Sequence, residues 1–156
     1  MKKLLILLLL IPSLSWGADY EKGVTAYNQG DYATAIKEWT PLAKQGHASA
    51  QYNLGVIYKN GDGVVQNYKT AVKWYTLAAE QGHAMAQNNL GSMYYRGDGV
   101  LQDNIYAHLW YNISASSVAS NAAENRTIVE EKMTTADISK AQELARQCVN
   151  KNYKDC

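Results

Sequence analysis

Apolar side chains recur at helical spacing through the middle of the chain. Those between Ala50 and Ile57 lie on one face of a predicted helix, and those between Ala71 and Ala78 lie on one face of another. The glycine-rich stretch 60–63 separates the two, because glycine readily adopts the positive φ that ends a helix and reverses the chain. The pattern predicts an antiparallel helix pair, whose second helix begins near Asn67, a residue type that caps helix N-termini.

The same pair occurs twice in succession. Residues 48–83 and 84–119 align without a gap and are identical at sixteen of thirty-six positions, which include Trp74 and Trp110. A repeat of this length is typical of solenoids, in which each unit is too small to bury its own apolar face and neighbouring units complete the core. We therefore predict an all-α fold, an α-solenoid of stacked antiparallel helix pairs, with both tryptophans in its core.

Less regular segments flank the two full repeats. Residues 20–47 read as a shortened starting unit, and the repeat pattern stops after residue 119. Two helices are predicted in the C-terminal cap 120–156. They begin after Asn121 and Thr134, each with an acidic residue three positions later, as in a capping box. This cap is expected to cover the open apolar end of the solenoid.

The N-terminus has the order of a secretory signal. Met1–Lys3 precedes the apolar block Leu4–Ile11 and a small-residue region that ends near Gly17. The eight residues of the block are too few to span a bilayer, which needs about 20. We expect residues 1–17 to be a signal peptide, cleaved after Gly17 or the following alanine. Residues 18–156 are then one exported solenoid domain, periplasmic or secreted, without a membrane span.

The net charge bears on the kinds of partner that the chain can bind, and the cysteines bear on its compartment. Without Lys2 and Lys3 the 15 basic residues fall to 13, against 14 acidic ones, so the net charge of the mature chain is about −1. The absence of a basic stripe or an acidic tail gives no support for binding to nucleic acid or to a membrane surface. Cys148 and Cys156 are the only cysteines, and a disulfide between them is predicted in an oxidising compartment. Free or intermolecular thiols are the alternative.

Candidates for chemistry are few. His47 and His83 occupy the same place in successive units, so they are expected in the turns between units, and His108 is expected on the surface. Asp62 and Asp98 each lie between two glycines, but the residues that follow lack the alternating oxygen ligands of a calcium loop. We predict no catalytic residue, no metal site and no cofactor.

The repeated motifs carry a family resemblance. Ala-x-Ala-Gln-x-x-Leu-Gly-x-x-Tyr, Gly-Asp-Gly-Val and Ala-x-x-Trp-Tyr-x-x-x-Ala resemble the Sel-one-like repeat (SLR) family of the tetratricopeptide superfamily, most strongly over residues 48–119. The resemblance implies a protein-protein interaction adaptor or scaffold, in which the first helix of each unit lines a concave groove for a protein or peptide. The groove positions that it implies are Tyr20, Val24, Tyr27, Tyr52, Val56, Lys59, Asn88, Ser92 and Tyr95.

Other interpretations stay open. Tyrosine suits a protein interface because it offers apolar area and a hydroxyl group, yet Tyr52 and Tyr95 could equally cover neighbouring helices. Some exported relatives are described as β-lactamase-like or penicillin-binding hydrolases, but their pattern has a cysteine pair within each repeat, which the repeats here lack. A structural subunit of an envelope assembly is a further alternative. We expect a monomeric protein that is not an enzyme.

Overall fold

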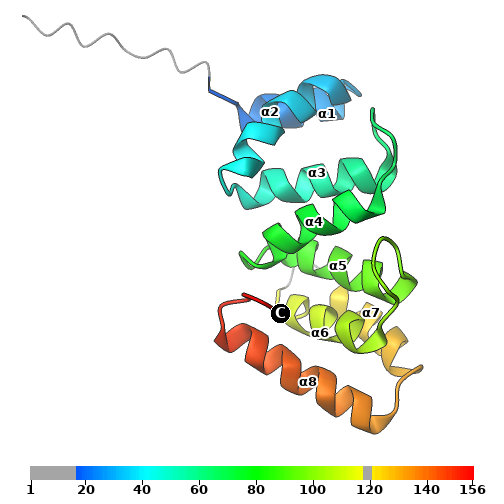
Figure 1. Cartoon of the computed structure of the whole chain (residues 1–156). Coiled ribbons are helices and arrows are strands. Elements are labelled where there is room, and N and C mark those ends of the chain that lie inside the picture. The colour runs from blue at the N-terminus through cyan, green and yellow to red at the C-terminus, as the bar shows by residue number, and fades with distance from the viewer. Residues whose placement is uncertain (1–16, 118–120) are drawn as a thin grey trace, which may run out of the picture.

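The chain folds into helices that stack along one direction (Figure 1). The computed structural model describes residues 17–117 and 121–156, and within these ranges it contains eight helices and no strand. All of the predicted signal peptide except Gly17 lies outside the described residues. The helices are α1 (Tyr20–Asn28), α2 (Tyr32–Lys44), α3 (Ala48–Asn60), α4 (Tyr68–Ala79), α5 (Ala84–Arg96), α6 (Asn104–Ser114), α7 (Ala122–Glu130) and α8 (Thr135–Asn150).

The first six helices form three pairs, which we call unit 1 (α1 and α2), unit 2 (α3 and α4) and unit 3 (α5 and α6). A glycine in the first helix of a unit brings a ring of the second helix close to the backbone. A Cβ atom on Gly55 would lie 2.5 Å from the Tyr75 ring, and one on Gly91 would lie 2.9 Å from the Tyr111 ring. Because a side chain does not fit there, glycine permits the close packing of both pairs.

The predicted helix boundaries in units 2 and 3 are confirmed. The side chains of Asn67 and Asp103 accept hydrogen bonds from backbone N–H groups in the first turns of α4 and α6. At the C-terminal ends of α3 and α5, Gly61 and Gly97 adopt left-handed backbone conformations with φ of 81° and 74°. The turn chemistry read from the sequence therefore sets where each helix starts and stops.

The two C-terminal helices do not form a fourth pair, since both pack mainly against α6. Helix α7 continues the row of first helices. Asn125 of α7 hydrogen-bonds to Asn88 of α5 across a unit boundary, and Asn53 of α3 hydrogen-bonds to Tyr20 of α1 across the boundary between units 1 and 2. The cap therefore adds one more first helix to the solenoid.

Helix α8 has a different role, because it lies over α6, the second helix of unit 3. Its residues Ala145 and Cys148 are buried in the same apolar cluster as Trp110 of α6. Beyond α8 the chain turns back toward the middle of the stack (Figure 1), and the Sγ atoms of Cys148 and Cys156 are joined in a disulfide at 2.00 Å. This geometry supports the predicted cysteine pair.

Three expectations from the sequence are wrong. Trp74 is only partly buried, whereas Trp110 is 2% exposed, because α8 covers α6 and not α4. His108 is fully buried rather than on the surface, since α7 packs over it. Asn121 precedes α7 but its side chain makes no capping bond, because its Oδ1 atom accepts a hydrogen bond from Asn88 instead. Thr134 does cap α8, as predicted.

Candidate partner-binding surface

The predicted groove residues Tyr20 and Tyr52 have equivalent surroundings in units 1 and 2. The Tyr20 ring stacks on His47 with a centroid distance of 4.9 Å, and the Tyr52 ring stacks on His83 at 4.7 Å. Both histidines cap the next first helix, because their Nδ1 atoms accept hydrogen bonds from backbone N–H groups of α3 and α5. Each tyrosine is thus fixed against the N-terminus of the following unit. His47 and His83 lie in the turns between units, as predicted.

Hydrogen bonds hold the tyrosines of α1 to unit 2. The hydroxyl of Tyr20 accepts from Asn53 Nδ2 at 3.2 Å, and the hydroxyl of Tyr27 donates to Asp62 Oδ2 at 3.1 Å. Burial, reinforced by the Asp62 carboxylate, raises the pKa of Tyr27 to about 12, so the ring stays neutral and keeps its proton for this bond. Asp62 of the Gly-Asp-Gly turn therefore links two units.

The remaining positions on α1 and α3 are half-buried. Val24 packs against the core of unit 1, and Val56 packs against the core of units 2 and 3. Tyr52 lies 6.0 Å from Tyr75, centroid to centroid, and burial raises its pKa. Lys59 is half-buried at the C-terminal end of α3. The structure thus brings these residues onto one face, where part of each side chain remains accessible.

Unit 3 differs, because two of its predicted groove residues, Asn88 and Tyr95, contact the C-terminal cap. Asn88 is only 6% exposed and bonds to Asn121 and Asn125, at 3.1 Å and 3.0 Å. Lys132 Nζ donates to the Tyr95 hydroxyl at 2.6 Å and lies 4.7 Å from the centroid of that ring. The row of accessible positions therefore runs along α1 and α3 and is interrupted at α5.

A small hollow of about 160 Å³ remains between α5, α6 and α7. Ser92 lines it and shares a hydrogen bond of 3.0 Å with the Tyr111 hydroxyl, and Tyr95, Asn125 and Ile128 complete much of its wall. Its size suits a few water molecules or a single side chain. The hollow is the remnant of the predicted groove in unit 3.

Sequence reasoning missed a buried polar link between α6 and α7. His108 Nε2 lies 2.8 Å from Glu130 Oε1, which Arg126 also approaches at 3.4 Å, and Arg126 donates to Asn112 at 2.9 Å. His108 stands where Val72 stands in unit 2, and this exchange of an apolar for a polar residue was the available signal. The cluster attaches α7 to the solenoid. Among the described residues, no group of three or more His, Cys, Asp or Glu is placed to hold a metal ion.

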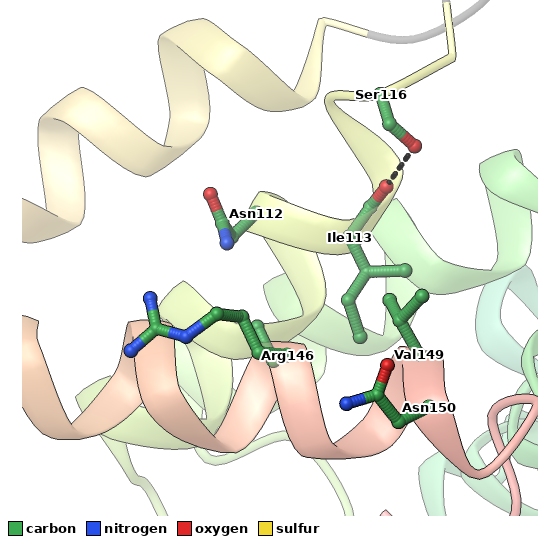
Figure 2. Close-up of a pocket in the computed structure, with 7 residues that line it drawn as sticks. Asn112, Ile113, Ser116, Arg146, Val149 and Asn150 are labelled. Atoms are coloured by element: carbon green, nitrogen blue, oxygen red, sulfur yellow. Dashed lines mark hydrogen bonds between the residues drawn. The ribbon is translucent and has the colours of Figure 1, made fainter.

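A further hollow lies where α8 crosses α6 (Figure 2). It has a volume of about 280 Å³ and is lined by Asn112, Ile113 and Ser116 on one side and Arg146 and Val149 on the other. Figure 2 shows the Val149 side chain directed toward Ile113, while Ser116 turns its hydroxyl back to the Ile113 carbonyl oxygen at 2.7 Å. The hollow is an opening in the contact between two helices of the chain itself.

Comparison with known proteins agrees with this architecture. The family model for the Sel1 repeat matches residues 48–83 and 84–117, which are units 2 and 3. The chain contains two consecutive Sel1 repeats. The family model starts its second repeat at residue 84, where the second repeat also starts in the gapless alignment. No curated protein matches the chain.

Two solved structures resemble this chain. One is a protective antigen present in uropathogenic Escherichia coli strains, described as displaying an SLR fold, with a TM-score of 0.78 and 29% identity over 84% of this chain. The other is a Sel1 repeat protein from Oxalobacter formigenes, with a TM-score of 0.66 and 32% identity over 69% of this chain. The chain covers 30% and 44% of these two proteins, respectively. The all-α solenoid prediction is confirmed.

Within the described residues, no helix is both long and apolar enough to cross a membrane.

Proposed function

We propose that this repeat protein is an exported, non-enzymatic adaptor that holds a protein or peptide partner on the face of α1 and α3. The observation that carries the proposal is the row of half-buried rings Tyr20, Tyr27 and Tyr52, each fixed by contacts to the following unit. Rings that are already held in place lose little conformational entropy when a partner binds, which favours affinity.

The partner lies along two units rather than three. Helix α7 and the residues after it already contact Asn88 and Tyr95, so the partner reaches Val56 and Lys59 and ends near α5. Because only units 1 and 2 are available for binding, the adaptor contacts a short segment of its partner. The adaptor works as a monomer, with the cap keeping the third unit from binding the same kind of segment.

Export is part of the proposal. The order of charged, apolar and small residues at the N-terminus supports a signal peptide over residues 1–17. The Cys148–Cys156 pair supports passage into an oxidising compartment, since disulfides persist there. The adaptor then acts in the periplasm or outside the cell.

Site-specific photocrosslinking tests the binding face. A benzoylphenylalanine residue in place of Lys59 is expected to form an adduct with one partner in intact cells. The matched control replaces Tyr95, which occupies the equivalent position in unit 3 beneath Lys132 and is expected to give no adduct. The purified partner is then expected to bind the Tyr52→Ala variant about tenfold more weakly, as for an aromatic anchor at an interface. Equal adducts from both positions, or unchanged affinity, would contradict the proposal.

The hydrolase alternative has a separate test. Purified protein is incubated at high concentration with a chromogenic β-lactam, and the adaptor proposal expects no turnover above that of heat-inactivated protein. Sustained turnover that is lost on unfolding would replace the adaptor by an enzyme.

A further inference from the structure

The second helices of units 1 and 2 enclose a groove that plays no part in the proposed adaptor face. It lies between the C-terminal end of α2 and α4, has a volume of about 490 Å³ and is hereafter called the α2–α4 groove. Trp74 and Leu77 supply its apolar wall, and Leu77 is 43% exposed. Lys44, Glu80 and Lys154 are its charged lining residues.

The next junction along the solenoid contains the equivalent groove, shifted by 36 residues. There Trp110 and Ile113 of α6 stand in place of Trp74 and Leu77. Helix α8 occupies this second groove, apart from the hollow of about 280 Å³ where it crosses α6. The small apolar residues Ala145 and Cys148 of α8 are buried with Trp110 and Ile113, and Val149 points toward Ile113 (Figure 2).

The glycine in the wall of each groove shows the difference directly. A Cβ atom on Gly82, at the filled junction, would lie 3.2 Å from the Tyr153 ring in the turn after α8. A Cβ atom on Gly46, the equivalent residue at the open junction, would meet nothing within 4 Å. The α2–α4 groove is therefore the same shape of site without its helix.

Two of the three charged residues that line the α2–α4 groove are lysines. Glu80 Oε2 lies 3.9 Å from Lys154 Nζ, so these two charges meet each other within the chain. Lys44 occupies the place of Glu80 at the open junction. Because Glu80 already meets Lys154, an occupant of the α2–α4 groove complements Lys44 with an acidic group.

We propose that the α2–α4 groove binds an amphipathic helix of a protein partner. The helix presents a stripe of small apolar residues to Trp74 and Leu77, as α8 presents Ala145 and Cys148 to Trp110 and Ile113, and it carries an acidic residue that meets Lys44. Packing of an apolar helix face into a groove is an established mode of peptide recognition. The site is separate from the face of α1 and α3.

A peptide taken from the chain itself provides the probe. The disulfide-closed peptide of residues 135–156 is made in two forms, one unchanged and one with Lys154→Glu, and each is titrated into the mature chain. Binding is followed through the indole N–H resonances of Trp74, Trp39 and Trp110 in two-dimensional NMR spectra. The Lys154→Glu peptide is expected to shift the Trp74 resonance, to leave Trp39 and Trp110 unchanged, and to bind about threefold more tightly than the unchanged peptide, as an exposed ion pair allows.

Variants of the full chain separate the groove from other contacts. Leu77→Glu is expected to weaken binding of the Lys154→Glu peptide about tenfold, since it removes apolar area and adds a like charge. Leu101→Glu is the matched control, because Leu101 is 89% exposed in the loop before α6 and outside the groove. Lys44→Glu is expected to reverse the preference between the two peptides.

Four outcomes would overturn the proposal. The first is no shift of Trp74 at millimolar peptide, and the second is a preference between the peptides that Lys44→Glu leaves unchanged. The third is a shift at Trp110 alone, which would mean that the peptide exchanges with α8. The fourth is concentration-dependent self-association of the mature chain that Leu77→Glu abolishes, which would make a second copy the occupant. None of these results depends on the adaptor face of α1 and α3.

Discussion

The two junctions of the solenoid are built from the same repeat yet end in different states. Between units 1 and 2, Trp74 is partly exposed and no side chain lies over Gly46. Between units 2 and 3, Trp110 is buried beneath α8 and Tyr153 lies over Gly82. The difference comes from α8 and the turn after it, which lie outside the repeats. A repeat thus fixes how its helices pair, while the exposure of its outer face depends on what the rest of the chain places there.

The largest expected effect separates the two tryptophans. Trp110→Ala is expected to lower the free energy of unfolding by about 4 kcal/mol, because it removes a buried indole and leaves a cavity beneath α8. Trp74→Ala is expected to cost only about 1–2 kcal/mol, since part of its ring is already in contact with solvent. Urea denaturation of both variants, followed by circular dichroism, measures the two values. Equal losses would show that α8 does not distinguish the junctions.

The sequence predicted the helix pairs well because their causes are local. Spacing of apolar residues, capping by Asn67 and Asp103, and the glycine turns at Gly61 and Gly97 act within a few residues of the helices that they define. The position of α8 depends on contacts between distant segments. The repeat pattern therefore did not show that Trp74 and Trp110, although equivalent in sequence, differ in burial.

The neighbouring residues did contain a signal for the cover on α6. Lys73 and Leu77 of α4 are exposed, whereas the equivalent Leu109 and Ile113 of α6 are buried. A change from lysine to leucine at one outward position indicates that a further element lies over that helix. Comparing the two repeats position by position, rather than counting their identities, would have located α8.

The second prediction removes the covalent closure beyond α8. The double variant Cys148→Ser/Cys156→Ser is expected to lose about 2–3 kcal/mol of unfolding free energy, as the loop-entropy model gives for a loop of this size. Because the turn that carries Tyr153 is released from α8, the filled junction becomes more like the open one. Acrylamide quenching of a Trp74→Phe background is expected to increase on reduction, since Trp110 gains exposure.

The matched control is the same background with both cysteines intact and no reductant. Quenching that stays unchanged on reduction would show that Trp110 is covered by α8 without help from the disulfide. The comparison of junctions would then depend on Ala145 and its neighbours alone.

The candidate surface was harder to predict than the fold. Tyr20 and Tyr52 could be assigned to one face because the family resemblance implies equivalent positions for them in units 1 and 2, and their stacking on His47 and His83 repeats with the units. The coverage of Asn88 could not be read from the sequence, because it arises when α7 contributes Asn125 to the same face. The groove that the family resemblance implies is therefore shortened by a helix outside the repeats.

The third prediction uses pH to weaken one junction selectively. Burial lowers the pKa of His83, so the folded state favours the neutral ring, whose Nδ1 atom caps α5. The unfolded chain takes up the proton first, so this contribution to stability is complete above the ordinary histidine pKa of about 6.5 and is lost as the pH falls through the lowered pKa of the folded state. We expect a loss of about 1 kcal/mol, the usual value of an N-cap, between pH 7.5 and 5.

The control is His83→Asn, which keeps a capping side chain but does not titrate, and it is expected to flatten this part of the pH dependence of the urea midpoint. His47→Asn is the comparison at the open junction, where the histidine is exposed. A pH dependence that survives His83→Asn would assign the effect to another group.

The smallest expected effect concerns the ion pair at the filled junction. Glu80→Lys introduces the residue type that Lys44 has at the equivalent position of unit 1. It places the new lysine next to Lys154. Since Lys154 is 58% exposed, solvent screens the pair, and a loss of about 0.5 kcal/mol in unfolding free energy is expected at low salt. Adding Lys154→Glu restores opposite charges and is expected to recover the loss, and both effects shrink in 0.5 M NaCl. If the double variant stays as unstable as the single one, Glu80 acts through packing on α4, and its ion pair with Lys154 has no energetic consequence.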